Sequence, residues 1–333
     1  MFGFLKPVPK PGQREPAPER VRLQGGLEFP IAQHVAEHQG YPIVDWTRVR
    51  AWVDGLDPAA RRGAAWNACE RAWLLRFSDA LGTDFRLDES GTAALVSSLA
   101  PNFARAALQF IVRTERRIGA VLEGLVEPAP WGKDILILFD DTETYYRYVS
   151  HYYPDAGEFA FSGGMQINEG CSHFVSVRNE LHVLEPMIVH EMTHASLEHL
   201  PLPLWLNEGL AVNTEQRLAG APRLPYGALE KLHDRLRRFW SRVSIQEFWS
   251  GESFHRPGDA NELSYALARI VVEQLAKDRE PFTRFVLRAD RADAGAGAAR
   301  ECLGLELGEV VTRLLERDTP RSWSPDPAKW KSR

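Results

Sequence analysis

The chain has 333 residues, a formal net charge of −5, 44% apolar residues and 26% charged residues. This composition is ordinary for a globular protein, and the length is enough for two domains with a well-buried core. A mildly acidic chain lacks the clustered basic residues of a nucleic-acid-binding protein. No apolar run reaches the roughly 18 to 20 residues of a membrane-spanning helix, so the sequence predicts neither nucleic-acid binding nor a membrane span.

The cysteines point to a reducing compartment. Cys69, Cys171 and Cys302 are far apart in sequence and odd in number, which is not the pattern of a disulfide framework. The first residues contain no apolar run long enough for a secretory signal. We therefore expect a cytoplasmic protein, although export by another route stays open.

The N-terminal third divides into a tail and a helical region. Residues 1–26 hold five prolines before Arg20, so we expect a disordered tail, with docking to a protein partner as a second possibility. From 27 to 127 we expect a helical region. Apolar residues recur there every three or four positions, as in 43–53, 64–81 and 102–125.

Residues 128–318 are expected to form a catalytic domain. The run 134–140 is continuously apolar between acidic residues and predicts a buried strand, and a helix follows through 145–149. The segment 171–177 alternates like a strand, and two helices come next. The polar residues 319–333 are expected to be a frayed C-terminal tail.

The motif His190-Glu191-Met192-Thr193-His194 carries the most chemistry in the chain. Residues four apart lie on one face of a helix, so both imidazoles can reach one metal ion, with Glu191 beside them. Zinc binds neutral imidazole well and lowers the pKa of bound water, and an adjacent carboxylate can act as the general base. Pro186 suits the first turn of the expected helix, and Pro201 and Pro203 follow its end.

A second segment supplies a third ligand. Leu204 to Glu215 reads as a helix that is apolar on one side, and a short proline-containing turn joins it to the first. Two helices so connected can bring Glu208 opposite the two histidines. A His, His, Glu set that leaves one position open is typical of a catalytic zinc site.

Together the two segments resemble the gluzincin zinc metallopeptidases, and most closely the peptidase-MA-like families. The resemblance rests on His-Glu-x-x-His followed by Trp205-Leu206-Asn207-Glu208-Gly209-Leu210-Ala211. It implies a zincin-like catalytic unit, and with the N-terminal helical region the expected fold class is predominantly helical α+β. It also implies one Zn²⁺ per chain, with His190, His194 and Glu208 as ligands and Glu191 as the base.

The spacing separates this chain from other zincins. Only thirteen residues lie between His194 and Glu208, which favours the compact peptidase-MA-like branch over thermolysin-like relatives. The metzincin pattern needs glycine where Leu197 stands and histidine where Leu200 stands. His199 is one place short of that position, so we interpret it as an ordinary helix-end histidine.

Five further residues are weaker candidates. Glu215 lies two turns beyond Glu208 and is either a hydrogen-bond partner of a ligand or a solvated residue. Tyr265 is a candidate donor to the oxyanion, with a packed aromatic as the alternative. Gln166 occupies the place of a glutamate in a related aminopeptidase element, and its neutral amide cannot attract a substrate's amino terminus as that glutamate does, so endo- and exopeptidase action both stay open. His173 and His255 are interpreted as surface or loop histidines.

The resemblance also implies a substrate-binding strand. In zincins an edge strand above the metal binds the substrate backbone by strand addition, and the segment 171–177 is our candidate for it. Gly163 and Gly164, just upstream, would allow the backbones to approach closely.

The expected function is hydrolysis of peptide bonds in a peptide or protein substrate. Two alternatives remain: a catalytically silent scaffold that binds a protein partner, and a zinc hydrolase of a non-peptide substrate. Cobalt, nickel or manganese would fit the same ligands less typically than zinc.

Overall fold

A computed structural model describes residues 15–127, 131–153, 164–220, 225 and 227–330. The chain forms two compact units, each assembled from two stretches of sequence. Unit 1 comprises Met1–Arg113 and Ala129–Leu181, and unit 2 comprises Thr114–Pro128 and His182–Arg333. The expected domain boundaries stay a prediction, because compactness alone does not define a part that folds independently.

Unit 1 is built on a five-stranded mixed sheet with the strand order β5-β6-β7-β9-β8. The central strands β6, β7 and β9 run parallel, whereas β5 and β8 join the two edges antiparallel. The central strands are almost fully buried, as expected for parallel strands that are covered on both faces. The strand bounds are β5 Arg86–Ser90, β6 Ala93–Ser97, β7 Asp134–Phe139, β8 Gly164–Ile167 and β9 His173–Val177.

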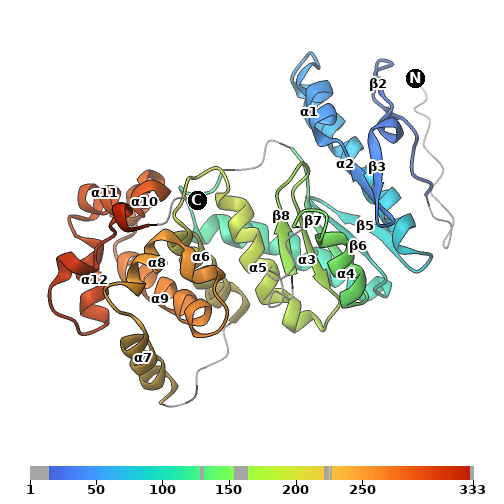
Figure 1. The fold of residues 1–333 in the computed structure, drawn as a ribbon. Coiled ribbons are helices and arrows are strands. Elements are labelled where there is room, and N and C mark those ends of the chain that lie inside the picture. Colours follow the sequence, from blue (N-terminus) through green and yellow to red (C-terminus); the bar gives the residue numbers. More distant parts are fainter. Residues whose placement is uncertain (1–14, 128–130, 154–163, 221–224, 226, 331–333) are drawn as a thin grey trace. The chain divides into compact units, whose positions relative to one another are not determined.

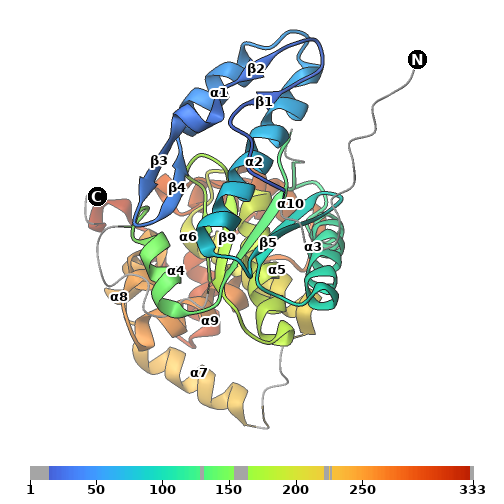
Figure 2. The ribbon, with the colours of Figure 1, turned by 90° about the vertical axis from the view of Figure 1, so that its right-hand side faces the viewer.

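Helices and a hairpin complete unit 1. Helix α2 (Ala60–Leu81) packs against β5, β6 and the hairpin strand β4 (Tyr41–Val44), and α4 (Thr142–Val149) packs against β7 and β9 (Figure 2). Strand β3 (Val35–His38) pairs with β4, and α1 (Trp46–Asp54) follows. Short strands β1 (Val21–Arg22) and β2 (Glu28–Phe29) pair nearer the N-terminus. The α+β class, the strand in 134–140 and the helix through 145–149 are confirmed.

The expectation of a helical region over 27–127 is correct only in part. Helices α1, α2 and α3 (Pro101–Val121) are present, but β2, β3, β4, β5 and β6 lie among them. Helix α1 begins only at Trp46, where the Asp45 side chain accepts a hydrogen bond from the Arg48 backbone N–H, so Ile43 and Val44 belong to β4 instead. These strands have two to five residues, too few for a periodic pattern to identify them.

The disordered tail expected over residues 1–26 is corrected for 15–26, and residues 1–14 lie outside the described residues. Arg71 on α2 binds both carboxylate oxygens of Glu15, at 2.7 and 2.8 Å. Arg76, one and a half turns further on, donates to the Pro18 carbonyl at 2.7 Å. Two guanidinium groups therefore hold this proline-containing stretch to α2.

His173 is a core residue, and its interpretation as a surface or loop histidine was wrong. It is 2% exposed on β9, with Nε2 2.8 Å from the Tyr148 hydroxyl and Nδ1 2.7 Å from the Cys171 carbonyl. Burial lowers the pKa of His173 to about 4. The signal was its place in an alternating strand, since the odd positions of β9 face the same core as Val175.

Unit 2 is helical around α9 (Figure 1). Helix α6 packs closely on α9 and also contacts α8, while α7 and α12 pack on other parts of α9. Within the described part of the chain, no helix has the length and apolar character needed to cross a membrane. The helix bounds are α5 Leu181–Leu197, α6 Leu204–Glu215, α7 Ala228–Phe239, α8 Ser244–Ser250, α9 Asp259–Leu275, α10 Arg279–Arg288, α11 Ala296–Ala298 and α12 Leu307–Leu314.

The frayed tail expected over 319–333 is corrected for 319–330, and residues 331–333 lie outside the described residues. Trp323 is 3% exposed, and its carbonyl accepts a hydrogen bond from the Trp249 indole at 2.9 Å. Gln246 donates to the Ser324 carbonyl and accepts from the Asp326 backbone N–H, both at 2.9 Å. The C-terminal segment thus closes over α8 through a buried tryptophan and one glutamine.

Candidate metal centre

Helix α5 carries the two histidines of the motif. The helix begins at Leu181, so Pro186 lies in its second turn and not in the first, as the sequence had suggested. Val189 and Leu197 are buried, and His190 and His194 are half-buried on one face. Their rings meet edge to face with centroids 4.7 Å apart. The expected one-turn spacing therefore brings the two imidazoles together.

Helix α6 places Glu208 against both rings. Its Oε2 lies 3.2 Å from His190 Nε2 and 3.4 Å from His194 Nε2. One nitrogen from each histidine and one oxygen from Glu208 lie within 4.8 Å of one another. Glu208 is 9% exposed, and the rest of its helix is anchored by the fully buried Trp205 and Leu206.

Glu215 holds His190 from the far side of the ring. Its Oε2 lies 3.1 Å from His190 Nδ1, so the two nitrogens of this imidazole face two different carboxylates. A carboxylate in this place fixes the tautomer and orientation of a metal-binding histidine. The structure therefore favours the hydrogen-bonded alternative for Glu215. His194 differs, because its Nδ1 is buried without a hydrogen-bond partner among the described residues.

Helix α9, which carries Tyr265, packs closely on α6 because the residue after Glu208 is a glycine. A Cβ added to Gly209 would lie 2.5 Å from Val272 Cγ2 and 2.7 Å from the Ala268 carbonyl oxygen. Only glycine permits this approach of the two backbones. The Asn213 side chain then bridges the helices, donating to the carbonyls of Gly209 and Arg269 at 2.7 and 2.9 Å.

Tyr265 lies beside the ligands rather than in a distant core. Its ring centroid is 6.4 Å from that of His190, and Phe254 packs on its edge at 5.3 Å. Burial raises the pKa of Tyr265 well above its usual value, and the nearby Glu208 and Glu191 carboxylates raise it further. The phenol therefore keeps its proton and donates a hydrogen bond to the Glu208 carboxylate.

Glu191 is half-buried on α5, between the ligand residue His190 and the buried Met192. Its charge acts on both histidines and on Tyr265, which places the carboxylate in the same electrostatic environment as the three ligand atoms. The Glu191 carboxylate is therefore within the electric field of any cation that His190, His194 and Glu208 could bind.

The electrostatics of the cluster favour a cation. Burial lowers the pKa of His190, but its hydrogen bonds with Glu208 and Glu215 outweigh burial and raise that pKa to about 10. In Glu208 the reverse holds: burial raises the pKa of the carboxyl, and the two imidazoles depress it well below its usual range. The negative potential that retains a proton on the imidazoles also attracts a metal ion, which competes with protons for the same nitrogen atoms.

The donor set fits zinc. Bonds of about 2.0–2.1 Å in a tetrahedral site separate two donor atoms by about 3.3 Å, and a catalytic site takes three protein ligands. The Glu208 oxygen lies at 3.2 and 3.4 Å from the two imidazole nitrogens. Two imidazoles and one carboxylate match the set that zinc prefers at such sites. The same distances also describe hydrogen bonds, so the fit shows compatibility and not the identity of a metal.

The remaining candidates have surroundings of their own. His199 and His255 are exposed, the former just beyond α5 and the latter at the end of a 3-10 turn, as expected. Gln166 on β8 donates to the Ser172 hydroxyl at 2.6 Å within unit 1. The segment expected to form an edge strand is the internal strand β9, because β8 pairs along its outer side. Gly164 opens β8, and Gly163 lies outside the described residues.

Sequence reasoning missed the link between α6 and α9. Neither Gly209 nor Asn213 was recognised as a packing residue. The available signal was a glycine in the middle of a strongly helical segment, which usually has a packing reason. Comparisons with protein-family models and with curated proteins find no match to this chain.

Proposed function

We propose that the chain is a zinc-dependent metallopeptidase of the gluzincin, peptidase-MA-like type. The observation that carries the proposal is the convergence of His190, His194 and Glu208, with Glu191 on the same helix as the histidines. A scaffold that only bound a metal would have no use for a carboxylate base next to its ligands. The proposed substrate is a peptide or protein.

Each residue of the cluster has a distinct role in this proposal. Bound zinc would lower the pKa of a water molecule and polarise the substrate carbonyl. Glu191 accepts the proton of the attacking water and passes it to the amine that leaves, as a general base and then a general acid. Tyr265, kept protonated by its surroundings, donates a hydrogen bond to the oxygen on which negative charge develops.

Glu215 orients a ligand and takes no part in proton transfer to substrate. Its hydrogen bond to His190 Nδ1 leaves Nε2 directed toward Glu208. That arrangement presents the lone pair of Nε2 to the metal site, which is the requirement for an imidazole ligand.

The proposal is tested with Glu191→Gln. The amide cannot accept the proton of water, so peptide hydrolysis should fall by at least about 100-fold. Zinc content, measured by elemental analysis, should stay near one per chain, because Glu191 is not a ligand. Glu198→Gln is the matched control, since Glu198 is exposed just beyond the same helix. Near-normal turnover by Glu191→Gln would contradict the mechanism.

The metal content itself separates the alternatives. Wild-type protein should hold about one zinc per chain, and Glu208→Ala should lose or weaken it. Bound zinc with no cleavage of a broad peptide library would favour the scaffold. Cleavage confined to non-peptide esters or epoxides would favour the other hydrolase class.

A cytoplasmic location is also part of the proposal. It is supported by the three cysteines, all of which are free and two of which, Cys69 and Cys171, are buried. Buried thiols of this kind are typical of proteins from reducing compartments.

A further inference from the structure

The hairpin of β3 and β4 ends in a tight turn at Gln39 and Gly40 (Figure 2). His38 and Tyr41 form the last pair of the ladder, so only these two residues connect the strands. Both have positive φ angles, 48° at Gln39 and 88° at Gly40. Glycine tolerates this left-handed conformation, but a glutamine adopts it at a cost in free energy. The tip is therefore a strained segment, which contacts outside the hairpin must hold in place.

The residues that follow α4 provide contacts to the tip. Nε2 of Gln39 donates to the Ser150 hydroxyl at 3.4 Å, which is long for a hydrogen bond. The rings of His38 and His151 lie against each other, with centroids 4.7 Å apart and planes tilted by 52°. One long hydrogen bond and one pair of imidazole rings thus connect the tip to the end of α4.

Tyr41 anchors the hairpin behind the tip. Its side chain is 4% exposed, and its hydroxyl donates to the Thr144 carbonyl at 3.0 Å. Its ring packs on Phe77 and Tyr148, with centroids 5.6 and 5.4 Å away. Burial raises the pKa of Tyr41 above its usual value, so the phenol stays neutral at any pH near 7. This anchor does not change with pH in the range where histidines titrate.

The surroundings of the two imidazoles offer little to a positive charge. Nε2 of His38 is buried without a hydrogen-bond partner among the described residues, so a proton added there would have no acceptor. His151 is half-buried, and burial together with the charge of His38 lowers its pKa below the usual value. Glu169 acts in the opposite direction, but it is exposed and water screens it. Tyr152, whose ring lies 4.8 Å from that of His151, stays neutral because burial raises its pKa to about 12.

The charged residues next to the pair on its own elements do not compensate it either. Glu37 precedes His38 on β3, but neighbouring side chains of a strand point to opposite faces. Arg147 lies one turn before His151 and is itself a cation, which pairs with Glu143 at 3.5 Å. Two protonated rings would therefore repel each other across the 4.7 Å between their centroids.

We propose that His38 and His151 form an acid-sensitive latch, which holds the hairpin tip on the end of α4 while both rings are neutral and releases it when they are protonated. Repulsion between the rings and the strain at Gln39 act in the same direction, while Tyr41 keeps the rest of the hairpin in place. The inference goes beyond the proposed catalytic function, because it concerns unit 1 and none of the metal-centre residues.

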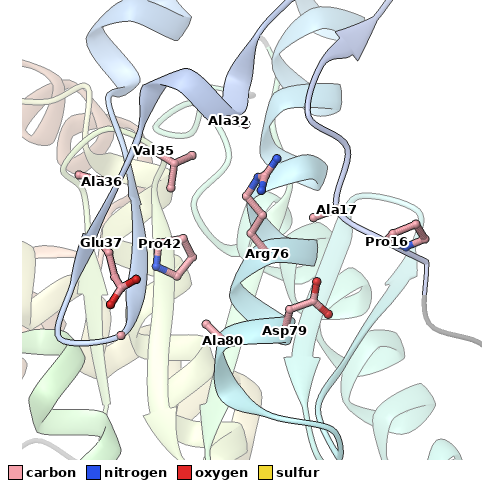
Figure 3. A pocket seen from close by; sticks show the side chains of 11 residues that line it. Pro16, Ala17, Ala32, Val35, Ala36, Glu37, Pro42, Arg76, Asp79 and Ala80 are labelled. Carbon is pink, nitrogen blue, oxygen red and sulfur yellow. The ribbon is translucent and has the colours of Figure 1, made fainter.

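Release of the tip would change the wall of a cavity of about 560 Å³ in unit 1 (Figure 3). Glu37, Gly40 and Pro42 of the hairpin line this cavity, and α2 contributes Arg76 and Asp79. Cavities of roughly 300–1,000 Å³ are of a size that binds small ligands. Because Gly40 belongs to the tip itself, the latch makes the shape of the cavity depend on pH.

The contacts also fix the direction of the pH dependence. His151 has a lower pKa while the tip is closed than after release, so closure is complete above about pH 6.5 and is lost as the pH falls. Glu70 has the opposite effect, because its pKa is raised to about 7 and its contribution to stability is lost as the pH rises. An opening induced by acid therefore cannot come from Glu70.

Hydrogen exchange of residues 36–43 tests the latch. It is measured by mass spectrometry on the full chain at pH 7.5 and pH 5, and corrected for the intrinsic exchange rate at each pH. In the wild type the corrected exchange should rise about tenfold or more at pH 5, because release is coupled to proton uptake. His38→Gln and His151→Gln should each lose most of that rise. His34→Gln is the control and should keep it, since the His34 ring stacks on Phe29 at 4.9 Å.

The titration of the rings gives a second readout, which decides even if loss of one ring opens the tip at every pH. NMR of ¹³C-labelled histidine should show that His151 takes up its proton at a higher pH in His38→Gln than in the wild type, because the neighbouring charge is gone. The latch would be overturned by the absence of a rise in exchange at pH 5 or by a full rise in both glutamine variants. An unchanged titration of His151 in His38→Gln would overturn it as well.

Discussion

Glu215 shows how much a single carboxylate outside the ligand set can control. It contacts His190 at 3.1 Å through the nitrogen that faces away from Glu208. We expect Glu215→Gln to weaken zinc binding about 10- to 100-fold, because the amide is a poorer acceptor for the imidazole N–H. Competition with a chromophoric chelator measures the affinity.

Glu273→Gln is the control for that measurement, since this glutamate is 58% exposed and bonds to Arg269 on α9. Zinc affinity should be unchanged in the control. If Glu215→Gln bound zinc as tightly as the wild type, Glu215 would have no part in orienting the ligand.

Glu70 gives unit 1 a pH-dependent stability. It is 1% exposed, accepts hydrogen bonds from the Lys133 backbone N–H and the Cys171 thiol, and burial raises its pKa to about 7. Because this value lies above the unfolded one, its contribution is largest below pH 4.5 and is lost as pH rises to 7. Between pH 5 and 8 the loss should be about 2–3 kcal/mol of unfolding free energy.

Urea unfolding of wild type and Glu70→Gln at pH 5 and pH 8 measures this loss. The glutamine has no proton to release, so its stability should fall less over that interval, by the amount given above. Groups other than Glu70 titrate in both proteins and cancel in the comparison. An equal fall in both would show that Glu70 is not the source.

At the scale of single residues, the sequence predicted those that belong to a recurrent catalytic motif. It missed residues whose burial results from tertiary packing. His190, Glu191, His194 and Glu208 follow from the spacing of a motif on helices, and the structure brings the three ligand candidates together. Glu70 belongs to no motif, and His173 is marked only by its place in an alternating strand. Their buried positions depend on strands and helices that meet only in the folded chain.

Among the elements, the contact between α6 and α9 is the most exacting. Gly209→Ala would place a methyl group 2.7 Å from the Ala268 carbonyl oxygen, which belongs to the backbone and cannot turn aside. We expect a loss of about 2–3 kcal/mol in the free energy of unfolding, from overpacking. Urea denaturation followed by tryptophan fluorescence measures it.

Gly119→Ala is the matched control for overpacking. Gly119 lies inside α3 with open space where a Cβ would be added, so alanine should stabilise the protein by about 0.5–1 kcal/mol. A neutral effect of Gly209→Ala would mean that α9 can move away from α6 without cost.

Length decided which elements could be read from the sequence. Helices α2, α5, α6 and α9 have 12 to 22 residues, long enough to be recognised as helices from the sequence. Strands β3 to β6 have four or five residues, and β6 (Ala93–Ser97) is buried along its whole length. A short run without alternation fits a buried strand and a piece of helix equally well, so these were assigned to the helical region.

For the whole molecule, all residues of the proposed metal centre belong to unit 2. A metal that binds the folded state stabilises it in proportion to RT ln(1 + [metal]/Kd). We therefore expect removal of zinc with a chelator to speed hydrogen exchange in α5, α6 and α9. Exchange in β7, β9 and α2 should change much less.

Hydrogen exchange with mass spectrometry, with and without the chelator, makes this comparison. Glu208→Ala should show the same pattern without any chelator. Uniform acceleration over both units would indicate that they unfold as one cooperative body, and no change at all would argue against a bound metal.

The division of the chain into units has a consequence for how it can be made and cut. Each unit takes sequence from two places, and the polypeptide passes between them three times, near residues 113, 128 and 181. During synthesis β6 cannot pair with β7, or β7 with β9, until the later strand has been made. The segment Thr114–Pro128 leaves the ribosome before the rest of unit 2. No single cleavage therefore yields an intact half, and a truncated gene for the metal-binding helices alone would lack the segment 114–128.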